Sequence, residues 1–174
     1  MKKIMIFGIP GSGKSTFSAL LAVLLHIPLY HLDRYFYTQR WKERAYNEFL
    51  AIQESFVEKE SWIIDGNATR SLEIRFKKAD VVLYFRFNRL LCLWRIFKRR
   101  VFKDPQILDR AEECNEQIHL KLISYLWGFN KRVQKPILEL RKKYPHVQFY
   151  ELRKDKDIQK FLQTIGHLKC QKSK

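Results

Sequence analysis

The residues with the clearest chemical pattern lie close to the amino end. Residues 8–15 read Gly-Ile-Pro-Gly-Ser-Gly-Lys-Ser and fit the pattern G-x-x-x-x-G-K-[ST] at every fixed position. A loop that wraps a polyphosphate must turn several backbone N–H groups inward, which requires positions without a Cβ, and Gly8, Gly11 and Gly13 supply them. The pattern therefore predicts a binding site for a nucleoside triphosphate.

The side chains at the end of this loop have distinct expected tasks. Lys14 would reach the β- and γ-phosphates as a point charge, and the Ser15 hydroxyl would ligate Mg²⁺. The first turn of the following helix would add free N–H donors and the positive end of its dipole. We expect the nucleotide to contact Gly8, Pro10, Gly11, Ser12, Gly13, Lys14, Ser15 and Thr16.

The flanks of the loop agree with this prediction. Residues 3–7 form a short β-branched and aromatic run that predicts a buried strand, and residues 16–25 form a mostly apolar segment that predicts a helix. A strand would thus deliver the loop and a helix would leave it. The alternative is a glycine-rich turn that binds nothing.

Two further aspartates each follow a predicted strand. Asp65 ends the apolar run 61–64, as a metal-binding carboxylate beside a phosphate loop does, so we expect it to bind Mg²⁺ together with Ser15. Asp33 follows the predicted strand 29–32. Ligands of open α/β sheets lie beyond the carboxyl ends of the strands, so Asp33 would orient or deprotonate an acceptor hydroxyl. Its alternative role is to cap the helix that begins at Arg34.

Several cations and aromatic side chains are candidates for the remaining contacts. Arg95 and Arg99 share one face of a predicted helix over 88–102, and like charges at this spacing suggest an anionic group opposite them. We expect both to contact the nucleotide and to stabilise the transferring phosphoryl group; the alternative is simple solvated charge. Trp41 and Arg70 are candidate acceptor contacts, although core packing is the alternative for the aromatic cluster around Trp41.

The order of elements predicts a single domain of the α/β class, over residues 1–174, with a five-stranded parallel sheet between two helical layers. Residues 103–116 are polar and predict a short lid over the phosphate site. A helical region over 115–144, interrupted near Gly128 or Pro136, would follow. A strand over 146–150, a helix over 157–168 and a frayed basic tail at 169–174 would complete the chain.

Composition limits the compartment and the partners. The net charge is +16, and residues 81–174 hold 22 Lys and Arg against 9 Asp and Glu. Such a field attracts polyanions, including nucleic acid, although a soluble basic surface without a nucleic-acid partner is the preferred interpretation.

Three scattered cysteines indicate reduced thiols. No apolar run reaches the ~18 residues of a membrane span, so we expect a cytoplasmic protein without a membrane partner. The oligomeric state stays open.

The sequence resembles the nucleoside monophosphate kinases, of which adenylate kinase is the most familiar. Asp65-Gly66 followed by Arg70 is similar to the family's Asp-Gly-x-x-Arg element, with one extra residue before the arginine. Residues 95–101 are similar to the segment at the family's lid hinge, whose arginines clamp the donor phosphates. The resemblance implies a P-loop kinase fold, ATP and Mg²⁺ as cofactors, and adenylate kinase-like phosphoryl transfer.

A closer resemblance is to the small bacterial proteins called DNA topology modulation proteins, and it covers about residues 1–150. Residues 107–109 depart from that group's Arg-Pro-Asp, and the AMP-binding loop of adenylate kinase has no clear counterpart. The shared landmarks are residues 31–33, 62–67, 92–100, 111–116 and 127–130.

Taken together, these features predict transfer of the ATP γ-phosphoryl group to a small acceptor, namely a nucleotide, a nucleoside or a metabolite. Two alternatives remain open. One is a nucleic-acid-binding protein in which ATP acts as a switch, and the other is a slow ATPase that has no acceptor.

Overall fold

A computed structural model describes residues 1–37, 42–101 and 120–172. Its centre is a five-stranded sheet in the order β2-β3-β1-β4-β5, and all four strand pairs are parallel. The predicted α/β fold with a five-stranded parallel sheet is therefore confirmed. The strands are β1 (Lys3–Gly8), β2 (Leu29–His31), β3 (Trp62–Asp65), β4 (Val81–Phe85) and β5 (Gln148–Leu152).

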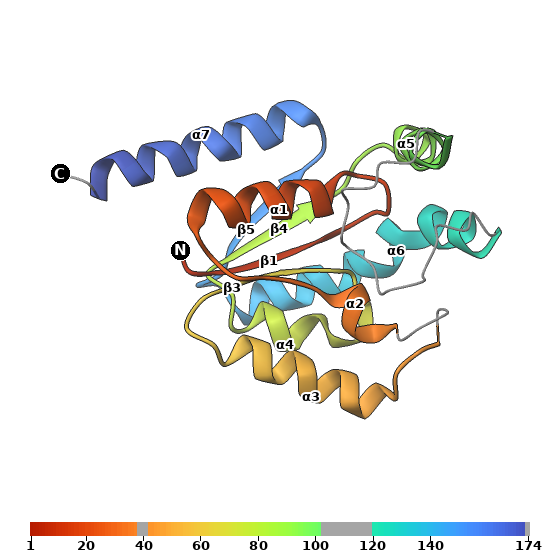
Figure 1. Cartoon of the computed structure of the whole chain (residues 1–174), viewed down its shortest axis with the longest axis horizontal. Coiled ribbons are helices and arrows are strands. Elements are labelled where there is room, and N and C mark those ends of the chain that lie inside the picture. The colour runs from red at the N-terminus through yellow and green to blue at the C-terminus, as the bar shows by residue number, and fades with distance from the viewer. Residues whose placement is uncertain (38–41, 102–119, 173–174) are drawn as a thin grey trace.

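Helices cover both faces of this sheet (Figure 1). One face carries α1 and α7, and the other carries α3, α4 and the carboxyl-terminal part of α6, while α5 lies at the end of the molecule where the phosphate loop turns. The helices are α1 (Lys14–Leu25), α2 (Leu32–Phe36), α3 (Tyr46–Val57), α4 (Leu72–Phe76), α5 (Arg89–Val101), α6 (Leu120–Lys143) and α7 (Asp155–Lys172), with a 3-10 turn, η2 (Thr69–Ser71), before α4.

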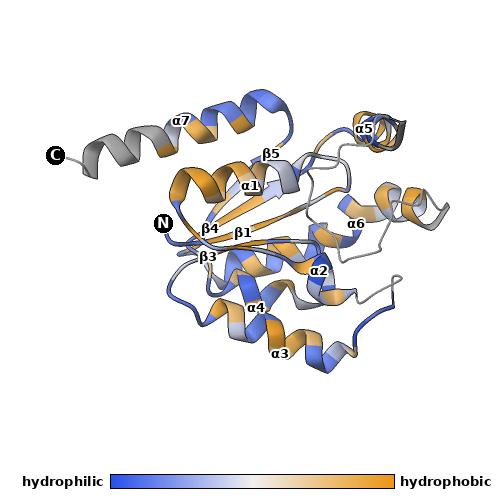
Figure 2. Ribbon diagram, in the orientation of Figure 1, coloured by the Kyte–Doolittle hydropathy of each residue, from blue (hydrophilic) through white to orange (hydrophobic). Residues whose placement is uncertain are grey.

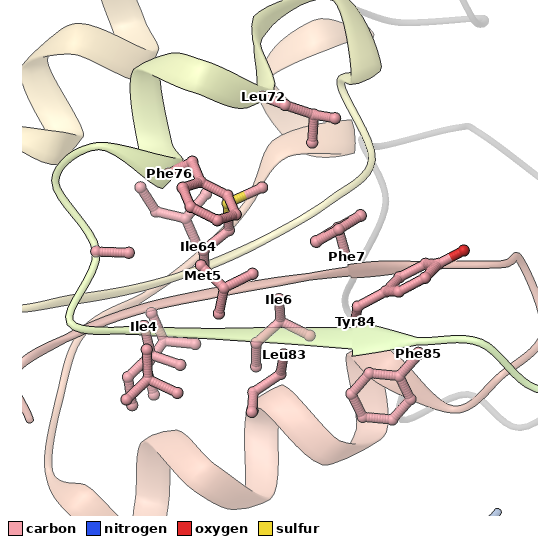
Figure 3. Packing of buried hydrophobic residues seen from close by; sticks show 14 of the residues in the cluster. Ile4, Met5, Ile6, Phe7, Ile64, Leu72, Phe76, Leu83, Tyr84 and Phe85 are labelled. Atoms are coloured by element: carbon pink, nitrogen blue, oxygen red, sulfur yellow. The ribbon is translucent and has the colours of Figure 1, made fainter. Parts of the chain in front are cut away.

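The core lies on both sides of β1 and β4. Every residue from Ile4 to Phe7 is 0% exposed, because a central parallel strand is covered by helices on both faces. Alternate side chains of the strands point to opposite layers (Figure 3). Phe7 stacks on Tyr84 toward α6, whereas Phe85 packs against Phe17 of α1. The hydropathy of the ribbon follows this arrangement, with apolar residues concentrated in β1 and α1 (Figure 2).

The prediction of an interrupted helix near Gly128 or Pro136 is wrong. The helix α6 is continuous from Leu120 to Lys143 and contains Pro136. A proline inside a helix removes one backbone hydrogen bond. However, Val133, Ile137 and Leu140 are only 1–7% exposed, so one apolar stripe packs on the sheet on both sides of the proline. This burial outweighs the local loss.

The carboxyl-terminal helix also differs from its predicted bounds. The helix α7 begins at Asp155 and runs to Lys172, so most of the segment 169–174, for which we predicted fraying, is helical. The predicted lid at 103–116 lies outside the described residues. In the described part of the chain, no helix is both long and apolar enough to cross a membrane.

The close approach of β1 and β4 yields a prediction at Gly8. Its φ is +153°, and a Cβ there would lie 2.4 Å from the Phe85 carbonyl oxygen. We expect Gly8→Ala to lower the free energy of unfolding by about 2 kcal/mol or more, because backbone on both sides must move apart. The matched control is Gly13→Ala, with φ +86° and nothing within 4 Å of its Cβ. It carries only a backbone strain of about 1 kcal/mol. Equal losses in urea unfolding would contradict the steric explanation.

Candidate functional site

The phosphate loop leaves β1 and turns directly into α1. Gly11 and Gly13 have φ values of +78° and +86°, which side chains with a Cβ rarely adopt. Gly11 also lies against α5, since a Cβ there would be 2.4 Å from the Cys92 carbonyl oxygen. A Cβ at Gly13 would meet nothing within 4 Å, so that side of the loop is open. The glycines therefore allow close packing on α5 at Gly11 and leave the side of Gly13 open.

The start of α1 has the free donors that an anion requires. Gly13 is its N-cap and makes no side-chain capping bond, and the first turn contains no acidic residue. The N–H groups of this turn thus stay available to a ligand at the positive end of the helix dipole. Lys14 and Ser15 are both partly exposed at this point.

The carboxylate of Asp65 lies beside this loop and is almost completely buried. Its side chain is 4% exposed, and its Oδ2 lies 2.9 Å from Nδ1 of His31. The two residues are register partners on the parallel strands β2 and β3. Burial raises the pKa of Asp65, but the hydrogen bond from His31, the charge of Lys14 and the Ser15 hydroxyl outweigh it, so the pKa lies below its usual value. Asp65 is therefore a carboxylate at neutral pH.

The same carboxylate has an oxygen available for a metal ligand. Oδ1 of Asp65 is buried and has no hydrogen-bond partner among the described residues. A hard cation with oxygen ligands and bound waters fits beside such an oxygen, and Ser15 faces the same carboxylate. Among the described residues, no group of three or more His, Cys, Asp or Glu could hold a metal. The arrangement fits Mg²⁺ that retains waters rather than a site built wholly from protein side chains.

Asp33 lies at the carboxyl end of β2, as predicted, but does not cap a helix. It is the second residue of α2, whose N-cap is His31, and it is exposed. The pKa of Tyr125 on α6 is affected by the charges of Arg132, Asp33 and Tyr37 and by a hydrogen bond with Asn67. Burial, the largest effect, raises that pKa to about 12. Asn67, which accepts the Gly8 N–H, thus links this phenol to the phosphate loop, and the Asp33 carboxylate and the Tyr37 phenol act on it electrostatically.

Arg95 lies against the phosphate loop from the α5 side. Its Nη1 is 3.4 Å from the Ser12 carbonyl oxygen, and its Nη2 forms an ion pair of 3.0 Å with Asp155, the first residue of α7. The guanidinium also lies over the ring of Phe87. Arg99 lies one turn further along α5. It is partly buried and takes part in at least one polar, electrostatic or ring interaction. That either contacts phosphate stays a prediction.

The predicted acceptor contacts are less well placed. Arg70 is exposed, and its guanidinium stacks over the ring of Tyr46 with a centroid distance of 4.4 Å. Trp41 lies outside the described residues. Thr16 is exposed in the first turn of α1, and Pro10 is partly exposed in the loop.

Three residues that the sequence analysis missed form hydrogen bonds that hold groups of the site in place. Asn67 Oδ1 accepts a hydrogen bond of 3.0 Å from the Gly8 N–H. His31 pairs with Asp65. Arg75 is fully buried and donates to the carbonyl oxygens of residues 66–68. Position at or just after a strand end could have indicated His31 and Asn67, whereas no local signal marks Arg75, which follows Asp65 by ten residues on the short helix α4.

Solved structures share this fold. A shikimate kinase from Acinetobacter baumannii in complex with shikimate aligns over 97% of this chain and 95% of its own, with a TM-score of 0.64 and 18% identity. A shikimate kinase from Bacteroides thetaiotaomicron aligns over 96% and 97%, with a TM-score of 0.52 and 15% identity. The chain therefore has the α/β fold of these P-loop kinases. Neither is a DNA topology modulation protein, so that finer resemblance stays a prediction.

Comparison of sequences adds one partial match. The chain is 32% identical over 94 residues to the UDP-N-acetylmuramate–L-alanine ligase of Streptococcus sanguinis strain SK36. That region is 52% of this chain but only 21% of the ligase, so the chain spans about a fifth of the relative it matches. No family model matches the chain.

The depressed pKa of Asp65 predicts a pH dependence of stability. Since the folded-state pKa lies below the unfolded value, the ionised carboxylate stabilises the fold above about pH 4, and this contribution is lost as the pH falls through the folded-state pKa. We expect Asp65→Asn to remove up to about one proton from the uptake that accompanies unfolding in acid. Urea unfolding at several pH values measures this uptake. The control is Glu54→Gln, at an exposed carboxylate of α3; an unchanged slope in Asp65→Asn would contradict the assignment.

Proposed function

We propose that this protein is a P-loop kinase that transfers the γ-phosphoryl group of ATP to a hydroxyl group of a small acceptor, as a single domain. The observation that carries the proposal is the open phosphate loop next to a buried, ionised Asp65 with one unpartnered oxygen. ATP supplies the transferable group when bound, and Mg²⁺ neutralises part of its charge. Asp65 and Ser15 would hold the metal.

The residues of the loop would provide binding and electrostatic stabilisation. The free N–H groups at the start of α1 would bind the phosphates, and Lys14 would add a full positive charge. The loop stays in this shape because its glycines pack on β4 and α5. Positioning and charge stabilisation account for most of the catalysis of phosphoryl transfer, so a preformed loop is what the reaction needs.

The acceptor would lie between α2 and α6. Tyr125 bonds Asn67 there and is affected by the charges of Asp33 and Tyr37, and this combination of one carboxylate, two phenols and one amide would suit a polar acceptor with hydroxyl groups. Asp33 would accept a hydrogen bond from the reacting hydroxyl and orient it. The shikimate bound by the Acinetobacter baumannii kinase is an acceptor of this class, and we propose a small hydroxylated metabolite ahead of a nucleotide.

Arg95 and Arg99 would act on the donor side. Arg95 already lies within 3.4 Å of the loop carbonyl of Ser12, so a short movement away from Asp155 would bring its guanidinium to the phosphates. An arginine delivered to the transferring group is worth about 10³–10⁵ in rate in other phosphoryl-transfer enzymes. We propose that Arg99, one helical turn away, assists it.

A screen for acceptors tests the kinase proposal. The purified protein is incubated with ATP and Mg²⁺ and with hydroxylated metabolites, nucleosides or nucleoside monophosphates, and ADP release is measured. We expect one acceptor class to stimulate release, and Lys14→Ala to reduce the stimulated rate by about 10²-fold or more, because a charge on the phosphates is lost. Lys78→Ala is the control, at an exposed lysine paired with Glu58. ATP turnover that no acceptor stimulates would instead indicate a slow ATPase.

A second candidate function rests on the surface of α5 and α6. Trp94, Phe97 and Trp127 are 57%, 60% and 50% exposed, which is unusual for large aromatic side chains. Residues 89–101 and 120–138 contain nine Lys and Arg and no Asp or Glu. Exposed rings beside cations suit the bases and backbone of a single-stranded nucleic acid.

Binding to a labelled single-stranded oligonucleotide tests this second candidate. We expect the logarithm of the affinity to fall linearly with the logarithm of the salt concentration. Trp94→Ala and Trp127→Ala would each weaken binding by roughly 10-fold through lost stacking. Leu138→Ala provides the control, because this side chain is 50% exposed on α6 but has no ring. Equal affinity in all three variants would contradict a stacking surface.

A further inference from the structure

Arg75 of α4 is a charged residue in the core. It is 0% exposed, although arginine is rarely buried without compensation. Burial lowers the pKa of Arg75 to about 10, against the opposing effect of Asp65 and Asp33, so the guanidinium stays protonated at neutral pH. A cation kept in the core at this cost needs a structural or functional reason.

Its hydrogen bonds all go to one short loop. Nη1 donates to the Gly66 carbonyl oxygen at 2.8 Å, and Nη2 donates to those of Asn67 and Ala68 at 3.0 Å and 3.3 Å. Three successive carbonyl groups thus converge on one side chain. A planar guanidinium, with its donors in a fixed fork, is suited to this task, whereas the single ammonium group of lysine is not.

The loop has a backbone that it would not adopt by itself. Gly66 has φ +144° and lies against Leu32, and Ala68 has φ +29°, a value that residues with a Cβ rarely adopt. Strained backbone persists only where its surroundings hold it. Arg75 is the side chain that bonds all three carbonyl groups, while the Ala68 carbonyl oxygen also accepts from the N–H and the hydroxyl of Ser71 at 3.0 Å and 3.2 Å.

This loop joins the two halves of the proposed site. It directly follows Asp65, the proposed metal residue. Its Asn67 side chain accepts the Gly8 N–H at the first residue of the phosphate loop and also lies next to Tyr125 on the acceptor side. The loop therefore contacts the donor side and the acceptor side at once.

We propose that Arg75 is a positioning residue that aligns the acceptor side with the phosphate loop through residues 66–68. This inference rests on the proposed kinase function. Arg75 contacts neither substrate directly in this arrangement. Its effect passes through the backbone of the loop, through Asn67 to Gly8 and through Gly66 to Asp65.

The test replaces the fork but keeps the charge. We expect Arg75→Lys to fold, to bind ATP within about threefold of the wild-type affinity, and to lose about 10- to 100-fold in kcat with its best acceptor, as small misplacements of reacting groups do. Arg141→Lys is the matched control, at an exposed arginine stacked on Phe149. Unchanged kcat in Arg75→Lys, or a loss equal to that of ATP affinity, would overturn the proposal.

A second measurement separates positioning from general loss of stability and does not need an acceptor. Hydrogen exchange of the Gly8 amide, followed by NMR, should accelerate in Arg75→Lys by about tenfold or more, while Met5 and Leu83 in the neighbouring sheet stay protected. Uniform acceleration, or none at Gly8, would overturn the proposal. If no acceptor is ever phosphorylated, the kinase function fails, yet this exchange measurement still decides whether Arg75 holds the loop.

A variant further along the chain of contacts covers the case in which Arg75→Lys does not fold. Asn67→Ala removes the acceptor of the Gly8 N–H but leaves the guanidinium and its carbonyl partners in place. We expect kcat to fall by about tenfold or more, and the melting temperature to fall by only a few degrees, because one buried N–H loses its acceptor. Wild-type kcat in Asn67→Ala would contradict the proposed link.

Discussion

One buried negative charge, the carboxylate of Asp65, determines how the rest of this site is arranged. A carboxylate with 4% exposure is stable only where cations and hydrogen-bond donors surround it. These groups come from different elements, with His31 at the end of β2, Lys14 at the start of α1 and Arg75 on α4. The carboxyl ends of β2 and β3 and the start of α1 must therefore lie at the same edge of the sheet, and a parallel sheet provides this edge.

The phosphate loop depends on a second constraint, close packing. Gly8 fits against Phe85 of β4, and Gly11 fits against Cys92 and Ile96 of α5, at distances that leave no room for a Cβ. Burial raises the pKa of the Cys92 thiol to about 11, so this thiol stays protonated and serves as a packing group. The loop is consequently preformed, and little ordering would be needed when an anion binds.

The proposed donor and acceptor sides are joined by short polar contacts rather than by the apolar core. Asn67 accepts the Gly8 N–H and bonds Tyr125 of α6, and Arg75 donates to the carbonyl groups of residues 66–68. Such contacts are directional, so they fix relative positions more tightly than apolar packing does. The same polar groups would determine which phosphoryl acceptor binds, because an acceptor that leaves a buried polar group without a hydrogen bond costs binding free energy.

The sequence by itself determined the phosphate loop, the five strands, the parallel α/β fold and the placing of Asp33 and Asp65 at strand ends. These features follow from local patterns: apolar strand periodicity, glycine spacing and helix signals within a few residues. Only the tertiary structure decided which side chains meet. His31 and Asp65 are 34 residues apart, Gly8 and Asn67 are 59 apart, and Arg95 and Ser12 are 83 apart. Their contacts depend on strand register and helix packing, which no local pattern contains. For the same reason α6 continues through Pro136, where burial of its apolar stripe against the sheet outweighs the local effect of proline.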